Sequence, residues 1–131
     1  MKRVFFTLVV MSAITVSTVL TSCRICTKEF VIISIKLQYP DSQPVVLDSC
    51  KVFWVRENLY LEHNSDFLWN GGNYLIVDDG MQDALRNRKD IMRFTGYLND
   101  KIVFERDVLV GADRCHVSYL GTEALTYIIQ Y

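Results

Sequence analysis

Short segments in which apolar and polar residues alternate recur along this chain, and residues typical of turns separate them. From Ile33 to Tyr39 every second residue is apolar, which is the period-two pattern of a strand with one buried face. The following Pro40-Asp41-Ser42-Gln43-Pro44 has the composition of a turn and ends this segment. A chain built from such units is predicted to fold mainly as β-structure.

Several later segments repeat the pattern and complete the predicted fold. Asn70-Gly71-Gly72-Asn73 is expected to form a turn, and Asn99-Asp100 suits a two-residue hairpin link. About seven short strands with turns between them predict an antiparallel Greek-key β-sandwich with one short helix. Beyond the first strand, the expected strands are 50–56, 74–77, 91–98, 101–110, 115–120 and 124–131.

The segment Cys50–Arg56 is unusual because both of its faces are apolar over Val52–Val55. Two interpretations stay open. Either this strand is covered on both sides, or it offers an aromatic patch to a partner.

The predicted helix begins at Asp78-Asp79-Gly80 and runs to about Asn87. An aspartate before the first turn accepts hydrogen bonds from free backbone N–H groups and complements the helix dipole. Met81, Ala84 and Leu85 would share one face of this helix.

The N-terminus has the three parts of a secretory signal peptide. Lys2 and Arg3 form a basic head, and residues 4–22 carry no charge. This apolar stretch ends in Leu20-Thr21-Ser22-Cys23, which resembles the lipobox of bacterial lipoproteins. The resemblance implies cleavage before Cys23 and acylation of that cysteine, and two or three acyl chains make a lasting membrane anchor. A plain signal peptide or an uncleaved membrane helix is the alternative.

These features divide the chain into a signal peptide (1–22), a lipid-bearing tether (23–29) and one domain (30–131). Removal of residues 1–22 leaves 12 basic and 15 acidic residues, a net charge of −3. A nucleic-acid partner is therefore not expected, because such a partner requires a basic surface. In some lipoproteins an acidic run after the cysteine directs surface display. Residues 24–29 have no such run, so we expect the outer membrane, with the domain facing the periplasm.

The domain resembles small β-sandwich lipoproteins of Bacteroidetes-type bacteria, of the carboxypeptidase regulatory-like (transthyretin-like) kind. Three stretches carry the resemblance, namely 39–45, 74–79 with 94–97, and 110–117. It implies a binding, adhesive or scaffolding module. One departure is that Leu47-Asp48-Ser49-Cys50 and a Trp-bearing strand stand where that family has a Gly-rich turn and a small-residue strand.

Lipidation of Cys23 would leave three cysteines in an oxidising compartment, where a disulfide is expected. Cys115 is the favoured partner in this bridge because it follows a tight turn and begins a predicted strand. Cys26 and Cys50 compete equally for it.

The sequence predicts no catalytic residue, no metal site and no cofactor. His63 is interpreted as a loop residue. A calcium site formed by Asp78, Asp79 and Asp83 with Glu62 or Asp66 is a minor alternative to helix capping. The residues considered for a ligand-binding surface are Trp54, Trp69, Tyr60 and His116.

The leading hypothesis is a non-enzymatic module, held at the membrane by its lipid, that binds an envelope protein or polysaccharide. The alternatives are a carbohydrate-binding protein or small enzyme centred on residues 62–66 and Trp69, and a pilus or adhesin subunit.

Overall fold

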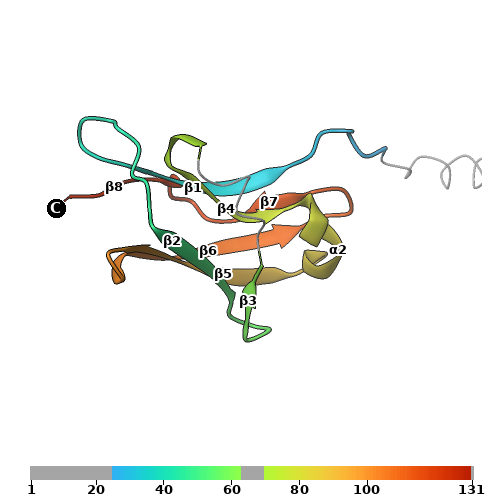
Figure 1. The fold of residues 1–131 in the computed structure, drawn as a ribbon. Coiled ribbons are helices and arrows are strands. Elements are labelled where there is room, and N and C mark those ends of the chain that lie inside the picture. Colours follow the sequence, from blue (N-terminus) through green and yellow to red (C-terminus); the bar gives the residue numbers. More distant parts are fainter. Residues whose placement is uncertain (1–24, 63–69, 131) are drawn as a thin grey trace, which may run out of the picture.

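The computed structural model describes residues 25–62 and 70–130, which form two β-sheets packed on each other (Figure 1). The smaller sheet has the strand order β4-β1-β8, and the larger sheet has the order β3-β2-β5-β6-β7. The strands are β1 Ile32–Gln38, β2 Ser49–Trp54, β3 Leu59–Leu61, β4 Asn73–Asp78, β5 Lys89–Leu98, β6 Lys101–Ala112, β7 Val117–Tyr119 and β8 Thr126–Ile128. The prediction of a mainly β fold with two sheets is therefore confirmed.

One strand pair departs from the expected antiparallel arrangement. Strand β8 runs parallel to β1, with Lys36 opposite Thr126 and Gln38 opposite Ile128. The other strand pairs of the described residues are antiparallel. Alternation of apolar residues reports which face of a strand is buried and carries no information on its direction.

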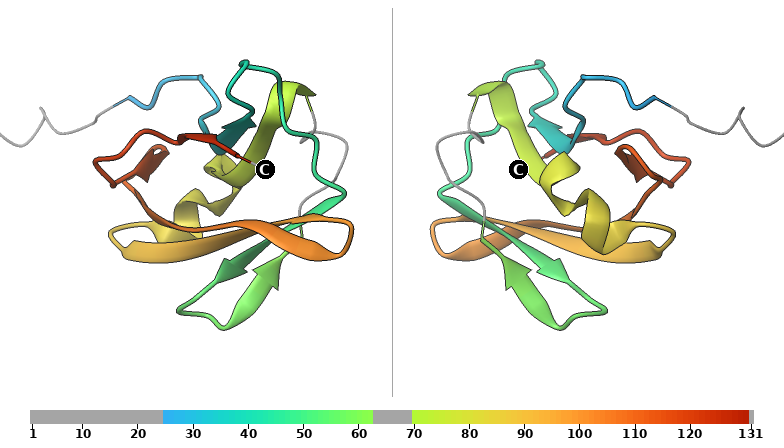
Figure 2. Two further views of the ribbon diagram at one scale, coloured as in Figure 1. Left: turned by 90° about the vertical axis from the view of Figure 1, so that its left-hand side faces the viewer. Right: turned by 90° about the vertical axis from the view of Figure 1, so that its right-hand side faces the viewer.

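The hydrophobic core lies between the two sheets, which Figure 2 shows as separate layers. On β1 the predicted face is confirmed, because Ile33, Ile35 and Leu37 are buried while Lys36 is exposed. The larger sheet supplies a second set of buried side chains from its inner face: Val52, Trp54, Met92, Phe94, Val108 and Val110.

The helical segment is shorter than predicted and has two parts. A 3₁₀ turn, η3 (Asp79–Met81), leads into α2 (Gln82–Leu85). The Asp78 carboxylate accepts a hydrogen bond from the Gly80 N–H, as expected of a cap. Leu85 is buried and Ala84 is exposed, so the inward face is narrower than predicted. The helix ends at Leu85 because Arg86 leaves the helical conformation, with ψ of 128°. Arg86 and Asn87, whose φ is 56°, then form a turn that the Arg88 N–H closes on the Leu85 carbonyl oxygen at 3.1 Å.

Strands β5 and β6 form a long hairpin that extends from one end of the domain to the other (Figure 1). Asn99 and Asp100 link them, with φ angles of 49° and 59°. Positive φ at both central residues matches the right-handed twist of the strands, and Asn and Asp tolerate it better than most residues. The predicted hairpin is thus confirmed.

A buried tyrosine fixes the connection that crosses from the smaller to the larger sheet. The hydroxyl of Tyr74 on β4 donates to the Val45 carbonyl oxygen at 2.7 Å and accepts from the Leu47 N–H at 2.8 Å. Burial raises the pKa of this hydroxyl. The two hydrogen bonds satisfy backbone groups of a buried loop segment, where water cannot replace them.

Within the described residues, no helix has the length and apolarity needed to cross a bilayer.

We predict that Tyr74→Phe lowers the free energy of unfolding by about 1–3 kcal/mol, because it leaves the buried Leu47 N–H without this partner. Urea denaturation followed by circular dichroism measures the change. Tyr60→Phe is the matched control. Because Tyr60 is 61% exposed, removal of its hydroxyl should change the free energy of unfolding little. Equal stability of the two variants would contradict the role given to Tyr74.

Candidate functional site

The outer face of the larger sheet carries the main candidate site. Along β2, Val52 and Trp54 point into the core while Phe53, between them, lies on the opposite face. Cross-strand pairing places Tyr60 of β3 beside Phe53, and their ring centroids are 5.0 Å apart. Of the two interpretations of the Val52–Val55 segment, the structure therefore supports an aromatic patch.

We define the sheet-face patch as Lys51, Phe53, Tyr60, Ile91 and Tyr97. The Lys51 ammonium nitrogen lies 5.7 Å from the ring centroids of both Tyr60 and Tyr97. A cation at this distance is attracted to the electron-rich ring faces. Tyr60 is 61% exposed and Ile91 is 40% exposed, so apolar surface on this face is available to a partner.

Ion pairs lie among and beside the residues of the sheet-face patch. Arg93, which pairs with Phe53 across the sheet, donates two hydrogen bonds to Asp107 at 2.7 and 3.1 Å. These hydrogen bonds raise the pKa of Arg93 and lower the pKa of Asp107. A second ion pair joins Arg88 to Glu57, which lies in the β2–β3 turn, at 3.4 Å. Aromatic side chains and arginine are both enriched in protein–protein interfaces.

Trp54, which the sequence suggested for a ligand-binding surface, does not lie on this surface. Only 7% of its side chain is exposed, because alternation along β2 directs it between the sheets. Among the candidates, Tyr60 is the one that the structure places in the sheet-face patch. Phe53 and Lys51 were not named as surface candidates from the sequence. Both flank Val52 on β2, so period-two spacing would have placed them on the face opposite the core.

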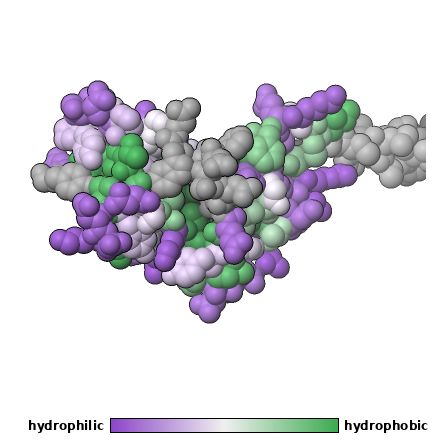
Figure 3. All heavy atoms as spheres, in the orientation of Figure 1, coloured by the Kyte–Doolittle hydropathy of each residue, from purple (hydrophilic) through white to green (hydrophobic). Residues whose placement is uncertain are grey.

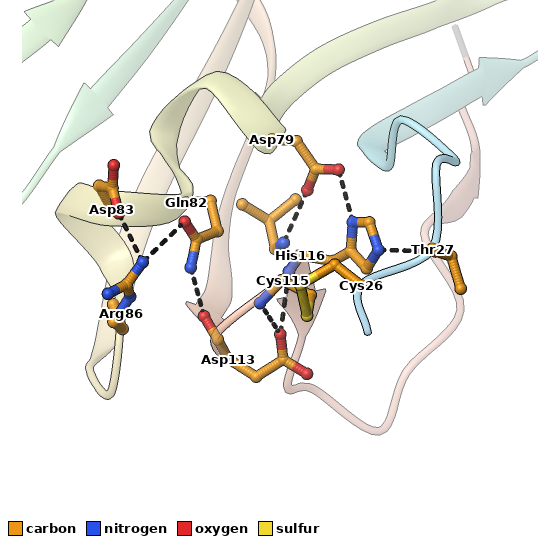
Figure 4. Close-up of a disulfide and its surroundings, with 10 residues drawn as sticks. Cys26, Thr27, Asp79, Gln82, Asp83, Arg86, Asp113, Cys115 and His116 are labelled. Atoms are coloured by element: carbon orange, nitrogen blue, oxygen red, sulfur yellow. Dashed lines mark hydrogen bonds and ion pairs between the residues drawn. A yellow bond between two sulfur atoms is a disulfide. The ribbon is translucent and has the colours of Figure 1, made fainter. Parts of the chain in front are cut away.

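A second cluster joins the N-terminal segment to the body of the domain (Figure 4). The Asp79 carboxylate accepts hydrogen bonds from the N–H groups of Val31 at 2.8 Å and Val117 at 2.9 Å. It also contacts His116 Nδ1 at 2.7 Å, while His116 Nε2 lies 2.8 Å from the Thr27 hydroxyl. Because a carboxylate only accepts, the Nδ1 proton points at Asp79.

Asp79 therefore has a different role from the predicted helix cap, which Asp78 alone provides. Burial alone would raise the pKa of Asp79, but its hydrogen bonds with Val31, His116 and Val117 outweigh this effect, so its pKa is lowered. These partners lie 37 to 48 residues away in sequence. No local pattern could have revealed them.

A disulfide reinforces the same junction. Cys26 and Cys115 are bonded, with their Cα atoms 5.3 Å apart, and Cys50 is free. The choice of Cys115 is confirmed, and Cys26 is its partner. Burial raises the pKa of the Cys50 thiol, which disfavours the reactive thiolate.

Thr27, His116 and Asp79 stand in the hydroxyl–imidazole–carboxylate order of a hydrolase triad. Both oxygens of Asp79, however, already hold backbone N–H groups. Two surface depressions among the described residues lie on other parts of the domain, one beside Arg93 and Asp107 and the other between β5, β6 and β7 beside Arg88 and Ser118. The cluster is best described as a junction that fixes the N-terminal segment. His116, a candidate ligand contact, belongs to this junction.

No group of three or more His, Cys, Asp or Glu side chains suited to a metal occurs in the described part of the chain. Asp78 and Asp79, considered for calcium, direct carboxylate oxygens at backbone N–H donors instead. Cys23, His63 and Trp69 lie outside the described residues.

Comparison with known proteins finds no match among family models, curated proteins or solved structures.

We predict that replacing Cys26 and Cys115 together by serine lowers the free energy of unfolding by about 2–5 kcal/mol, because the bridge closes a long loop in the unfolded chain. Chemical denaturation of both proteins measures this loss. Cys50→Ala is the control for thiol removal and should cost about 1 kcal/mol or less. A double-serine variant as stable as the native chain would show that the bridge contributes nothing.

The Asp79 junction predicts a specific acid sensitivity. Since folding lowers the pKa of Asp79 below its usual value of 3.8, its stabilising contribution is complete above about pH 4 and disappears as pH falls through the lowered pKa. Asp79→Asn should therefore be less stable than the native chain at neutral pH, and the difference should shrink in acid. Asp83→Asn, which alters an exposed carboxylate on α2, should leave the pH profile nearly unchanged. A difference for Asp79→Asn that is constant from about pH 2 to 7 would contradict this assignment.

Proposed function

We propose that this chain is a lipid-anchored protein of the bacterial envelope that binds another envelope protein through the sheet-face patch, without catalysing a reaction. The observation that carries the proposal is the aromatic pair of half-buried Phe53 and exposed Tyr60 on the outer face of the larger sheet. Tyrosine is one of the residues that most often supply binding energy in protein interfaces.

The ring geometry favours a protein over a polysaccharide as the partner. The planes of Phe53 and Tyr60 are tilted by 54° relative to each other, so they do not form one flat platform for successive sugar rings. Lys51 and the Arg93–Asp107 pair add charges of both signs around the rings. Mixed charge and tilted aromatic rings suit the irregular surface of a folded protein.

The anchor rests on the sequence, in which a basic head, an apolar stretch and Leu20-Thr21-Ser22-Cys23 occur in order. We place the domain on the periplasmic face of the outer membrane. The two-sheet fold is compatible with a transthyretin-like lipoprotein, whose relatives are described as binding or scaffolding modules, and this family assignment is part of the proposal.

A photo-crosslinking amino acid at position 60 tests the binding surface in cells. We expect a discrete crosslinked species between the Tyr60 variant and one envelope protein, with a yield that falls when Phe53→Ala is added. The same amino acid at Ile128, which is 57% exposed on the smaller sheet, should not give this species. An absence of adducts at position 60, or the same adducts at both positions, would refute the proposed surface.

Two alternatives have distinct outcomes. Saturable polysaccharide binding by the purified domain, abolished by Trp69→Ala, would support the carbohydrate-binding alternative. Self-association of the delipidated domain through an edge strand would support the pilus or adhesin alternative, whereas a strict monomer argues against it.

A further inference from the structure

The N-terminal segment is attached to one end of the domain by covalent and hydrogen bonds. Cys26 is joined to Cys115, Thr27 contacts His116, and the Val31 N–H donates to Asp79 (Figure 4). On the other side of this junction, the Asp113 carboxylate accepts from the N–H groups of Cys115 and His116. The first residues of the domain therefore have a fixed direction relative to its body.

This end of the domain lies opposite the β5–β6 hairpin turn. Lys89 pairs with Gly111 near the junction, and Leu98 pairs with Lys101 at the turn. These pairs stand at the two ends of the ten-residue strand β5, nine residue steps apart, which corresponds to about 30 Å at about 3.3 Å per residue. In Figure 1 the N-terminal segment and α2 lie at one end and the turn at the other. We call these the junction end and the hairpin end.

Cys23 precedes Cys26 by three residues. Three residues span at most about 11 Å when fully extended. A lipid on Cys23 would therefore hold the disulfide, and with it the junction end, within a short distance of the bilayer surface.

The junction end exposes apolar side chains beside that attachment point. Ile25 is 94% exposed and Phe30 is 64% exposed. Figure 3 shows hydrophobic and hydrophilic atoms side by side on the segment that leaves the body at this end. The neighbouring charges are of both signs, with Lys28 and Arg114 against Glu29 and Asp113, so this surface does not require an anionic membrane.

We infer that the junction end rests on the bilayer, with Ile25 and Phe30 in the headgroup region and the hairpin end directed away from it. Apolar side chains next to a lipid anchor lose contact with water there, and long basic side chains can lie along the interface with their charges in the headgroups. This inference rests on the proposed lipidation of Cys23. It gives the sheet-face patch a lateral position, because Phe53 pairs with Arg93 midway along β5.

Quenching of tryptophan by brominated lipids tests this orientation in the full lipidated chain. Three variants are reconstituted in phosphatidylcholine vesicles with and without brominated acyl chains, namely Phe30→Trp, Arg114→Trp and Ile102→Trp. Emission of the native chain is subtracted from each variant. We expect strong quenching at position 30, clear quenching at position 114 and almost none at position 102, which lies at the hairpin end.

Position 114 is the decisive one, because it is distant from the lipid in sequence and close to it only through the fixed junction. Replacing Cys26 and Cys115 by serine in the Arg114→Trp chain should reduce its quenching. Equal quenching at positions 114 and 102, in chains that float with the vesicles, would overturn the orientation and leave the anchor intact. Chains that do not float, and whose N-terminal peptide has an unmodified mass, would overturn the proposed anchor and the orientation together.

Discussion

The apolar layer between the two sheets is the interaction on which the rest of this structure depends. The larger sheet contributes side chains such as Trp54 and Phe94 to this layer from its inner face. Strict alternation along β2 then forces Phe53 onto the outer face, where Tyr60 and Ile91 are also exposed. The candidate binding surface is thus a consequence of how the core is filled, because two adjacent aromatic residues on one strand cannot both be buried on the same side.

The junction at Asp79 holds the N-terminal segment in one direction relative to the body of the domain. A short tether that left the domain free to rotate would present the sheet-face patch in every direction. Here a disulfide and several hydrogen bonds hold residues 26–31 against the loop before β7. Ion pairs on an exposed surface would hold this segment weakly, whereas the Asp79 carboxylate is mostly buried and satisfies two backbone N–H groups. The disulfide and these hydrogen bonds therefore fix the N-terminal segment, which a flexible linker would leave free to move.

Local sequence patterns predicted the buried face of a strand and the position of a hairpin turn. Alternation identified the buried face of β1, and the Asn99–Asp100 link identified the hairpin, because both depend on a few adjacent residues. The parallel pairing of β8 with β1 was not predictable, since the residues concerned are about 90 positions apart and alternation has no direction. The choice of Cys26 or Cys50 as the disulfide partner of Cys115 was also open, because Cys26 and Cys115 are 89 residues apart in sequence.

The candidate site was predictable in part. Tyr60 was among the aromatic residues considered for a ligand-binding surface, and the apolar character of Val52–Val55 indicated a patch or a doubly covered strand. Selecting between those interpretations required knowledge of the layers, which also moved Trp54 into the core. The Asp79 and His116 junction depends on long-range contacts that single-sequence patterns do not contain.

We propose that a partner protein covers the sheet-face patch in the envelope. Hydroxyl-radical footprinting, read by mass spectrometry, compares the purified delipidated domain with the protein in isolated envelopes. We expect strong modification of Tyr60 in the purified domain and protection of Tyr60 in the envelope, with little modification of buried Tyr74 in either sample. Equal modification of Tyr60 in the two samples would contradict this proposal.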